Sequence, residues 1–349
     1  MLLNQLELTN YRNFVSEKFE FEKGVSLIIG PNGIGKTNIL ESISILAPGR
    51  GLRSSKPEEI VRHEENAWNI SALCEGNLGA ARLDVSYSSI SAKKQVNFND
   101  SKISSNELTN FINVIWLTPQ MDGIFLGSPS ERRKFLDRMT FSKHTNHASL
   151  VSKYEKLQRE RMQILEKSGS NSWLEIIEKE MADLAIGITE NRLGTINNVN
   201  KDISNIDPIF PKAKLELEGK IVEFFDKENR LDLILEEFKA NREKDKYSGR
   251  NHFGVQKSDM QTFYDKKNIP AHNCSTGEQK ALLTSIILAH QLASNNRPLL
   301  LLDEIFVHLD ENRRKALGEF LLFNGAQTFI TSTDIETKNY LDSAVTIML

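Results

Sequence analysis

Cysteine is almost absent from this sequence of 349 residues. Cys74 and Cys274 stand far apart and in no metal-ligand spacing, which argues against a disulfide framework or a cysteine-rich zinc site and fits a reducing compartment. Long hydrophobic runs are also missing, because the richest stretch, 281–293, is shorter than the roughly 20 apolar residues that span a bilayer. The first residues do not resemble a secretory signal. We therefore expect a cytoplasmic protein with no membrane partner.

The sequence also lacks a strong excess of positive or negative charge. Lys and Arg number 44 and Asp and Glu number 47, which gives a net charge of −3. This balance argues against a protein that coats DNA permanently, since such binding rests on cationic contacts to phosphate. The hydrophobic fraction of 39% and the charged fraction of 26% are typical of a folded soluble chain. The length indicates two or three domains, or one large α/β domain with an insertion.

Proline is missing between Pro129 and Pro208, and this stretch is rich in Glu, Lys, Arg, Leu and Ile. Apolar residues at helical spacing predict helices over 150–166 and 173–189. We interpret the region as packed helices rather than a long coiled coil, because the apolar pattern is too short and too interrupted. The predicted domains are an N-terminal part (1–119), a mainly helical insertion (120–250) and a C-terminal part (251–349).

Short apolar runs predict strands on both sides of this insertion. They lie at 6–8, 25–29, 70–74, 81–87, 114–117, 298–302, 327–332 and 345–349. Helices are predicted at 279–296 and 311–322. Alternating helices and buried strands are typical of a parallel α/β sheet. The predicted fold class is therefore α/β, with a parallel-rich sheet that is split in sequence by the helical insertion.

A phosphate-binding motif follows the strand at 25–29. Every fixed position of G-x-x-x-x-G-K-[ST] is matched by Gly30, Pro31, Asn32, Gly33, Ile34, Gly35, Lys36 and Thr37, and a helix follows from Asn38. Backbone N–H groups of such a loop bind phosphate oxygens, the lysine adds a point charge, and the threonine hydroxyl binds Mg²⁺. A chance match in a glycine-rich turn is the alternative, and the strand–helix context disfavours it. The motif alone does not separate kinases, GTPases and ATPases.

Two carboxylates end a second apolar strand. Asp303 and Glu304 follow Leu299-Leu300-Leu301-Leu302, at the strand end where open α/β sheets bind their ligands. We expect Asp303 to hold Mg²⁺ and Glu304 to accept a proton from the attacking water. Two solvated acids at a strand end are the alternative. A second carboxylate beside the metal-binding acid favours hydrolysis over kinase chemistry.

A capping box precedes the helix at 279–296. Ser275 and Glu278 fit S-x-x-E, so this segment can be no more than a well-capped helix. Gly277 lies in the first turn, where it costs about 1 kcal/mol relative to alanine, and it permits close approach to the backbone. Exposed N–H groups and a serine hydroxyl form an anion site. We expect its ligand to be the γ-phosphate of ATP bound to another copy of the chain.

The order of these motifs resembles the ABC-type ATPase head of SMC proteins and transporter subunits, and more closely the RecF family of bacterial DNA replication and repair ATPases. The resemblance covers almost the whole chain. It implies that 1–119 and 251–349 are the two parts of the ATPase head and that 120–250 is the helical lobe II. Its further motifs are 6–14 (LELTNYRNF), 127–137 (GSPSERRKFLD), 275–283 (STGEQKALL) and 301–310 (LLDEIFVHLD). The second of these is the most telling, because transporter subunits would not share it.

The resemblance implies ATP and Mg²⁺ as cofactors. It makes Gln120 a glutamine that senses the metal and the γ-phosphate, and it places Gln120 in the catalytic site with Lys36 and Glu304. Asp310 would be an acidic residue at the interface between two subunits. Ser275, Thr276, Gly277, Glu278 and Gln279 would close over ATP in the opposite subunit of an ATP-dependent homodimer. It also implies DNA binding at gaps and single-strand/double-strand junctions, with RecO- and RecR-type partners that load RecA.

Two departures from the family pattern stand out. ABC heads usually have a switch histidine after the penultimate strand, where this chain has Thr331 and Thr333, so we expect slow hydrolysis. The stretch 254–259 reads GVQKSD where the family has Gly-Pro-His-Arg-x-Asp. The lysine at 257 keeps the charge but loses the bidentate guanidinium.

Local basic clusters permit DNA binding, although solvated faces explain them equally well. The candidates are Arg132, Arg133, Lys134, Lys244 and Lys246. Two other functions stay open: a transporter energiser, which would need a membrane partner, and an ABC-type ATPase of the overcoming-lysogeny or anti-phage kind. The chain shows no acidic nuclease cluster after the ATPase motifs.

Overall fold

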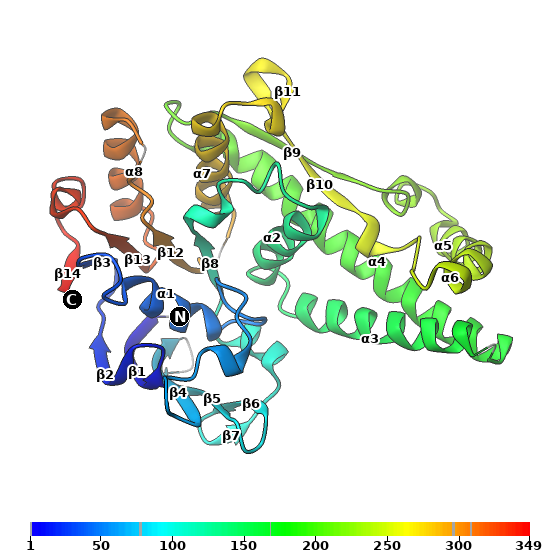
Figure 1. The fold of residues 1–349 in the computed structure, drawn as a ribbon. Helices are drawn as coiled ribbons and strands as arrows, with labels where there is room; N and C mark the ends of the chain where they lie inside the picture. The colour runs from blue at the N-terminus through cyan, green and yellow to red at the C-terminus, as the bar shows by residue number, and fades with distance from the viewer. Residues whose placement is uncertain (1, 77–78, 168, 295–296, 308) are drawn as a thin grey trace.

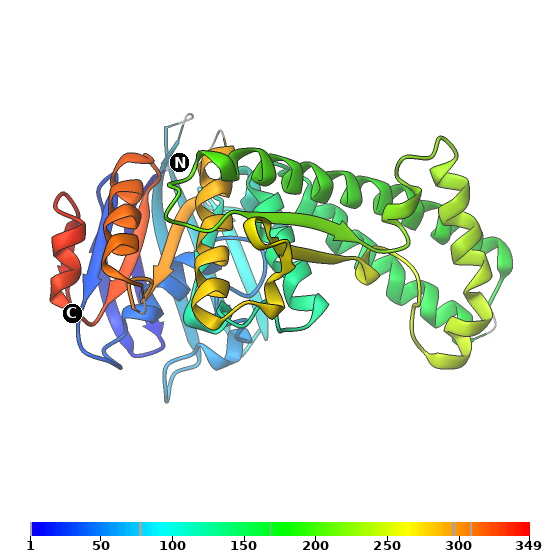
Figure 2. The ribbon, with the colours of Figure 1, turned by 90° about the horizontal axis from the view of Figure 1, so that it is seen from above.

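A computed structural model describes residues 2–76, 79–167, 169–294, 297–307 and 309–349. It consists of a head built on two sheets and an arm of long helices that extends away from it (Figures 1 and 2). N- and C-terminal segments lie together in the head, and residues 129–264 supply most of the arm. In the described part of the chain, no helix combines the length and hydrophobicity needed to cross a membrane.

The central sheet has five strands, all parallel to their neighbours, in the order β14 (Val345–Met348), β3 (Val25–Ile29), β13 (Thr328–Ser332), β12 (Leu299–Asp303) and β8 (Val114–Leu117). The middle strands are buried along their whole length, as continuous apolar runs require in a sheet covered on both faces. The predicted parallel sheet, split in sequence, is therefore confirmed.

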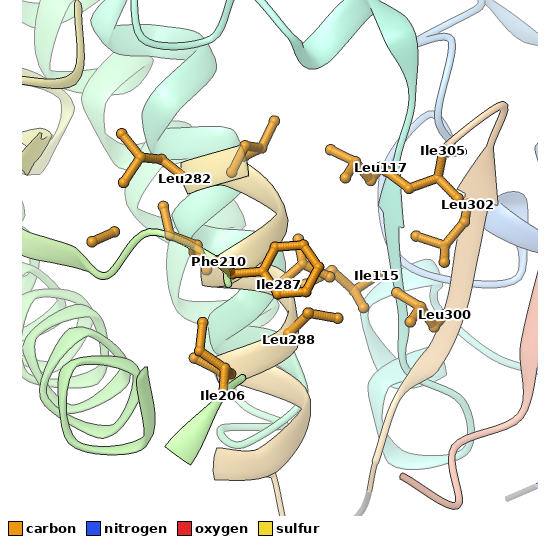
Figure 3. Packing of buried hydrophobic residues seen from close by; sticks show 14 of the residues in the cluster. Ile115, Leu117, Ile206, Phe210, Leu282, Ile287, Leu288, Leu300, Leu302 and Ile305 are labelled. Atoms are coloured by element: carbon orange, nitrogen blue, oxygen red, sulfur yellow. The ribbon is translucent and has the colours of Figure 1, made fainter. Parts of the chain in front are cut away.

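Alternate residues of these strands belong to two separate hydrophobic cores, one on each face of the sheet. Ile115, Leu117, Leu300 and Leu302 pack toward α7 (Thr276–Ala293), and Figure 3 shows them opposite its apolar side chains. The neighbouring strand residues belong to the second core, which includes Ile39, Leu40 and Ile43 of α1 (Lys36–Ile45). The sheet thus separates α1 from α7. α8 (Glu311–Phe323) covers the same face as α7.

A second, antiparallel sheet completes the head. Its order is β2 (Phe14–Glu20), β1 (Leu2–Tyr11), β4 (Ala67–Gly76), β5 (Gly79–Ser88), β6 (Lys93–Phe98) and β7 (Ser101–Lys102). The strands predicted at 6–8, 70–74 and 81–87 exist, but they pair here and not in the parallel sheet. Burial alternates along β5, because one face of this sheet covers the second core and the other meets solvent.

The arm is built on α2 (Pro129–Phe141), α3 (His147–Glu166) and α4 (Asn171–Asp202), with α5 (Arg230–Ala240) and α6 (Arg242–Ser248) at its tip (Figure 1). Both predicted helices are present and longer than expected. A three-stranded sheet of β9 (Ala213–Glu218), β10 (Asp259–Tyr264) and β11 (Ile269–Pro270) runs along α4. The strand β10 lies after residue 250 but pairs with β9, so this sheet crosses the predicted domain boundary, and the boundaries themselves stay predictions.

Helix α7 begins at Thr276, three residues before the predicted start, because Ser275 caps it. Residues 295 and 296 of that predicted helix lie outside the described part of the chain. The C-terminal elements otherwise match the predicted ranges closely: α8, β13 and β14 begin within one residue of them.

Candidate nucleotide-binding site

The phosphate loop joins β3 to α1, and its backbone needs glycine at two positions. Gly33 and Gly35 have φ angles of 82° and 122°, a region that side chains disfavour. A Cβ at Gly35 would lie 2.8 Å from the ring of Phe14. Asn13, in the turn between β1 and β2, donates to the carbonyl of Ile34 at 2.8 Å. The turn after β1 therefore supports the loop directly.

Lys36 folds back over this loop and is only 5% exposed. Its Nζ donates to the carbonyls of Gly30 (2.8 Å) and Pro31 (3.2 Å) and lies 3.6 Å from Oε1 of Glu304. The ammonium group is thus held at the helix N-terminus, where the backbone N–H groups also favour an anion. Phosphate oxygens are a suitable ligand for this arrangement.

A hydroxyl–carboxylate cluster lies beside the lysine. Thr37 Oγ1 donates to Oδ1 of Asp303 at 3.0 Å, and Thr331 Oγ1 donates to the same oxygen at 2.7 Å. These groups come from α1, β12 and β13, at the carboxyl edge of the parallel sheet. One carboxylate and one hydroxyl are the hard oxygen donors with which Mg²⁺ is held while it keeps several waters. Among the described residues there is no larger cluster of metal-ligating side chains.

Glu304 has a left-handed backbone conformation, with a φ of 52°. Its N–H donates to Thr331 Oγ1 at 3.1 Å, which fixes this turn at the end of β12. The conformation aims the carboxylate at Lys36 and leaves the side chain 22% exposed. Residues held in such a region cost about 1 kcal/mol or more and concentrate at functional sites. The second carboxylate therefore reaches the site because the backbone is held in a disfavoured conformation.

Gln120 and Asp310, the two other site residues predicted in the head, lie outside this cluster. Gln120 lies exposed in a 3-10 turn directly after β8, and β8 is the parallel neighbour of β12, so Gln120 leaves the sheet at the same edge as Asp303. Asp310 caps α8 by accepting from the N–H of Arg313 at 3.0 Å, and it pairs with the Arg313 guanidinium at 3.2 Å.

The segment 275–279 forms the predicted capping box at the start of α7. Glu278 accepts from the N–H and the hydroxyl of Ser275, each at 3.0 Å, and its other oxygen accepts from Lys267. These donors, the Lys267 ammonium first, lower the pKa of Glu278 to about 2. A Cβ at Gly277 would meet no atom within 4 Å, so packing within the chain does not require glycine there.

The 127–137 motif and the 254–259 stretch meet at the base of the arm. Arg132 pairs with both carboxylate oxygens of Asp259 (2.8 and 2.7 Å) and donates to the carbonyl of Gly127 at 2.7 Å. Arg133 donates to the carbonyl of Ser258 at 2.8 Å. The guanidinium groups of these two candidate DNA-binding residues therefore form hydrogen bonds that join α2 to the start of β10. Lys134, Lys244 and Lys246 are exposed.

Sequence reasoning missed a buried network beside this junction. Arg192 of α4 donates to both oxygens of Asp137 (2.8 and 2.9 Å), to the carbonyl of Val255 (2.9 Å) and to Ser258 Oγ (3.0 Å). Burial alone would raise the pKa of Asp137, but Arg192 and His147 hold it below its usual range. A single arginine inside a long helix carries no sequence signal of this role.

The departure at 254–259 has an internal role in this chain. Gln256 Oε1 accepts from the Tyr154 hydroxyl at 3.1 Å, and its Nε2 donates to the carbonyl of Phe253 at 2.7 Å. Lys257 is exposed. The glutamine thus ties the turn before β10 to α3. Sequence reasoning also missed Arg12, which forms a bidentate pair with the fully buried Glu41 just after the phosphate loop (2.9 and 2.6 Å).

A phosphate loop, a strand ending in Asp-Glu and the capped helix α7, all around one split parallel sheet, define an ABC-type ATPase head of the SMC kind. The model of the RecF/RecN/SMC N-terminal domain family matches residues 2–349. The chain is 44% identical to a DNA replication and repair protein RecF of Rickettsia canadensis, over 100% of this chain and 99% of that protein. It belongs to the RecF family.

Other relatives and solved structures agree. A RecF protein of Rickettsia bellii is 43% identical over 96% of this chain and 95% of its own length. The structure of the recombination mediator protein RecF with ATP, from the RecFOR pathway, superimposes with a TM-score of 0.83 at 25% identity, covering 95% of this chain and 93% of that one. An SMC head domain from Pyrococcus furiosus shares the fold, with a TM-score of 0.58 at 17% identity, covering 99% of this chain and 92% of that one.

Proposed function

We propose that this protein is an ATP-driven switch that binds DNA during replication and repair. The observation that carries the proposal is the cluster of Lys36, Thr37, Asp303 and Glu304 within a chain that is related to RecF over its full length. Two copies would bind two ATP molecules between them and grip DNA while ATP is bound. Hydrolysis would then release the DNA.

Within one subunit, residues 30–38 bind the phosphates of ATP. Thr37 and Asp303, with Gln120 entering from the β8 edge, are the residues that would hold Mg²⁺, and the ion would neutralise phosphate charge. Glu304 is the general base for water. Hydrolysis is weak because the end of β13 has no histidine, and Thr331 is engaged by Asp303 and by the Glu304 N–H.

The segment 275–279 acts in trans. Its support is the open space at Gly277, since nothing within the chain requires glycine at that position. A glycine there lets a ligand from a second molecule approach the N-terminus of α7. Asp310 lies at the start of α8 and would cross the interface between the two subunits.

The DNA partner is a gapped duplex or a single-strand/double-strand junction, and RecO- and RecR-type proteins are the further partners through which RecA is loaded. The similar RecF that was solved with ATP is a recombination mediator of the RecFOR pathway, and this supports these partners. Lys134, Lys244 and Lys246 remain DNA-contact candidates. Arg132 and Arg133 are weaker ones, because their donors serve the α2–β10 junction. The RecF relationship disfavours the transporter and anti-phage alternatives.

The decisive test is binding to gapped duplex, single strand and blunt duplex, each with and without ATP and at several salt concentrations. We expect tighter binding to the gapped duplex, only with ATP, and a salt slope that counts the phosphate contacts. The Lys36→Ala variant is the control, since it keeps the surface charge elsewhere and loses the nucleotide. Binding that is equally tight with and without ATP would overturn the proposal.

A further inference from the structure

A hairpin of the arm contacts residues 275–279 at the start of α7, which we call the signature segment. The 3-10 turn Asp265–Lys267 follows β10 and leads into β11, and Figure 1 shows this hairpin next to α7. Lys267 donates its ammonium group to Oε1 of Glu278 and lies 5.3 Å from the ring of Tyr264. The arm therefore touches the segment that we expect to meet the ATP of a second copy.

The contact also involves Ser275 through a shared carboxylate. Oε1 of Glu278 accepts from Lys267, while Oε2 accepts from the Ser275 N–H and from the Ser275 hydroxyl. A serine hydroxyl has one proton. While that proton is donated to Glu278, it is not available to a phosphate oxygen.

We propose that Lys267 is a positioning residue that makes the signature segment ready for the γ-phosphate of ATP bound to a second copy. Its ammonium group has two effects in the same direction. It keeps the Glu278 carboxylate paired when the Ser275 hydroxyl turns toward phosphate, and it neutralises a negative charge that would repel the approaching nucleotide. This inference rests on the proposed ATP-dependent dimer and adds a regulating contact from the arm to it.

The size of the effect follows from exposure and symmetry. The Lys267 and Glu278 side chains are 48% and 28% exposed. We therefore expect the loss of one such ion pair to change the dimerisation equilibrium about threefold. A two-fold symmetric dimer contains the contact twice. Loss of Lys267 should therefore weaken dimerisation by about tenfold, since the two effects multiply.

The experiment compares Lys267→Met with Lys266→Met, which removes the adjacent exposed lysine of the same turn. Sedimentation with a slowly hydrolysed ATP analogue gives the dimer dissociation constant, and a fluorescent ATP analogue gives nucleotide binding to the monomer. We expect Lys267→Met to raise the dimer dissociation constant about tenfold. Lys266→Met should leave it unchanged, and both variants should bind nucleotide and melt like the wild type.

Rescue separates positioning from a general loss of structure. Lys267→Arg keeps a positive charge beside Glu278, so dimerisation should recover in this variant. Equal dimerisation of the Lys267→Met and Lys266→Met variants, or no recovery in Lys267→Arg, would overturn the role of Lys267 alone. A wild-type chain that stays monomeric with the analogue would instead overturn the proposed function together with this inference.

Discussion

At the residue scale, the site depends on a few side chains whose hydrogen bonds are already in place. Asp303 is 9% exposed and accepts from two threonines, while Lys36 is held by carbonyls of its own loop. Such preorganised polar groups lose little freedom when a ligand binds. Substitutions at these positions should therefore affect binding and hydrolysis more than folding.

The Lys36→Ala substitution removes the only ammonium group that contacts the phosphate loop in the described structure. We expect nucleotide binding to fall by at least about 100-fold, because a charge-assisted contact to phosphate is lost. Titration with a fluorescent ATP analogue measures this. Lys23→Ala, an exposed lysine before β3, is the control and should bind normally. Retained binding in Lys36→Ala would mean that the nucleotide lies elsewhere.

Glu304→Gln keeps the size of the side chain and removes its basicity. We expect ATP hydrolysis to fall by about 100-fold or more while ATP binding persists, so an ATP-bound dimer should accumulate. Light scattering at saturating ATP measures the dimer, and phosphate release measures hydrolysis. A variant that remains monomeric under these conditions contradicts the composite-site mechanism.

At the element scale, the helices and the hairpin of the arm are joined by buried charges rather than by apolar contacts alone. The Asp137–Arg192 pair connects α2 to α4, and Arg192 continues to the turn before β10. Burying both ions is costly unless every donor is used. This junction therefore holds α2, α4 and the turn before β10 together at the base of the arm.

The Arg192→Met substitution tests that junction. It leaves the buried Asp137 with His147 as its remaining hydrogen-bond partner, so we expect the free energy of unfolding to fall by about 3 to 5 kcal/mol. Urea denaturation measures the change. The double variant with Asp137→Asn should recover part of the loss, because no unpaired charge then remains. A loss below about 1 kcal/mol in Arg192→Met would show that the pair contributes little.

The Ser275→Arg substitution tests α7 as an interface element. Arginine removes the cap hydroxyl and places a long side chain where a second subunit would approach. We expect ATP-dependent dimerisation to be lost while the monomer still binds ATP, since among the described residues the Ser275 side chain hydrogen-bonds only to Glu278. Sedimentation and ATP titration separate the two results. Loss of both properties would argue against a role in trans.

At the scale of the whole molecule, stability should depend on pH through His290. Burial, and then the charges of Arg138 and Lys143, lower the pKa of this histidine from 6.5 to about 4. Between pH 6.5 and 4, His290 is therefore protonated in the unfolded chain and neutral in the folded chain. The free energy of unfolding falls as the pH drops from 6.5 toward 4. The expected loss is about 3 kcal/mol.

Chemical denaturation across that pH range measures the effect, with His290→Gln as the matched variant. Glutamine can still hydrogen-bond to Ser142, the partner of His290 at 3.0 Å, but it does not titrate. We expect a flatter pH dependence in the variant between pH 6.5 and 4. Identical slopes in the two proteins would show that His290 takes up its proton without unfolding.

The net charge of −3 also acts at this scale. It argues against constant DNA binding, and the structure shows that two of the candidate arginines are engaged inside the α2–β10 junction. The proposed DNA surface is therefore local and would be completed when two copies come together. A near-neutral chain suits a protein that must release DNA as well as bind it.

Short-range sequence patterns were enough to predict the local features of the site. The glycines, lysine and threonine of the phosphate loop, the Asp303-Glu304 strand end and the Ser275 cap are short-range patterns with a fixed local geometry, and the parallel strands are continuous apolar runs. Backbone conformation and burial on both faces determine such features, so neighbouring residues contain the information.

The contacts between residues far apart in the sequence became visible only in the folded chain. The fold brings Thr331 to Asp303, Asp259 to Arg132, Arg192 to Asp137 and Lys267 to Glu278. It also assigned the N-terminal strands to a separate antiparallel sheet. The reason is physical: a charged side chain shows no periodicity, and its partner is determined by which segments pack together. The local chemistry could therefore be predicted, whereas the contacts that connect the site to the arm could not.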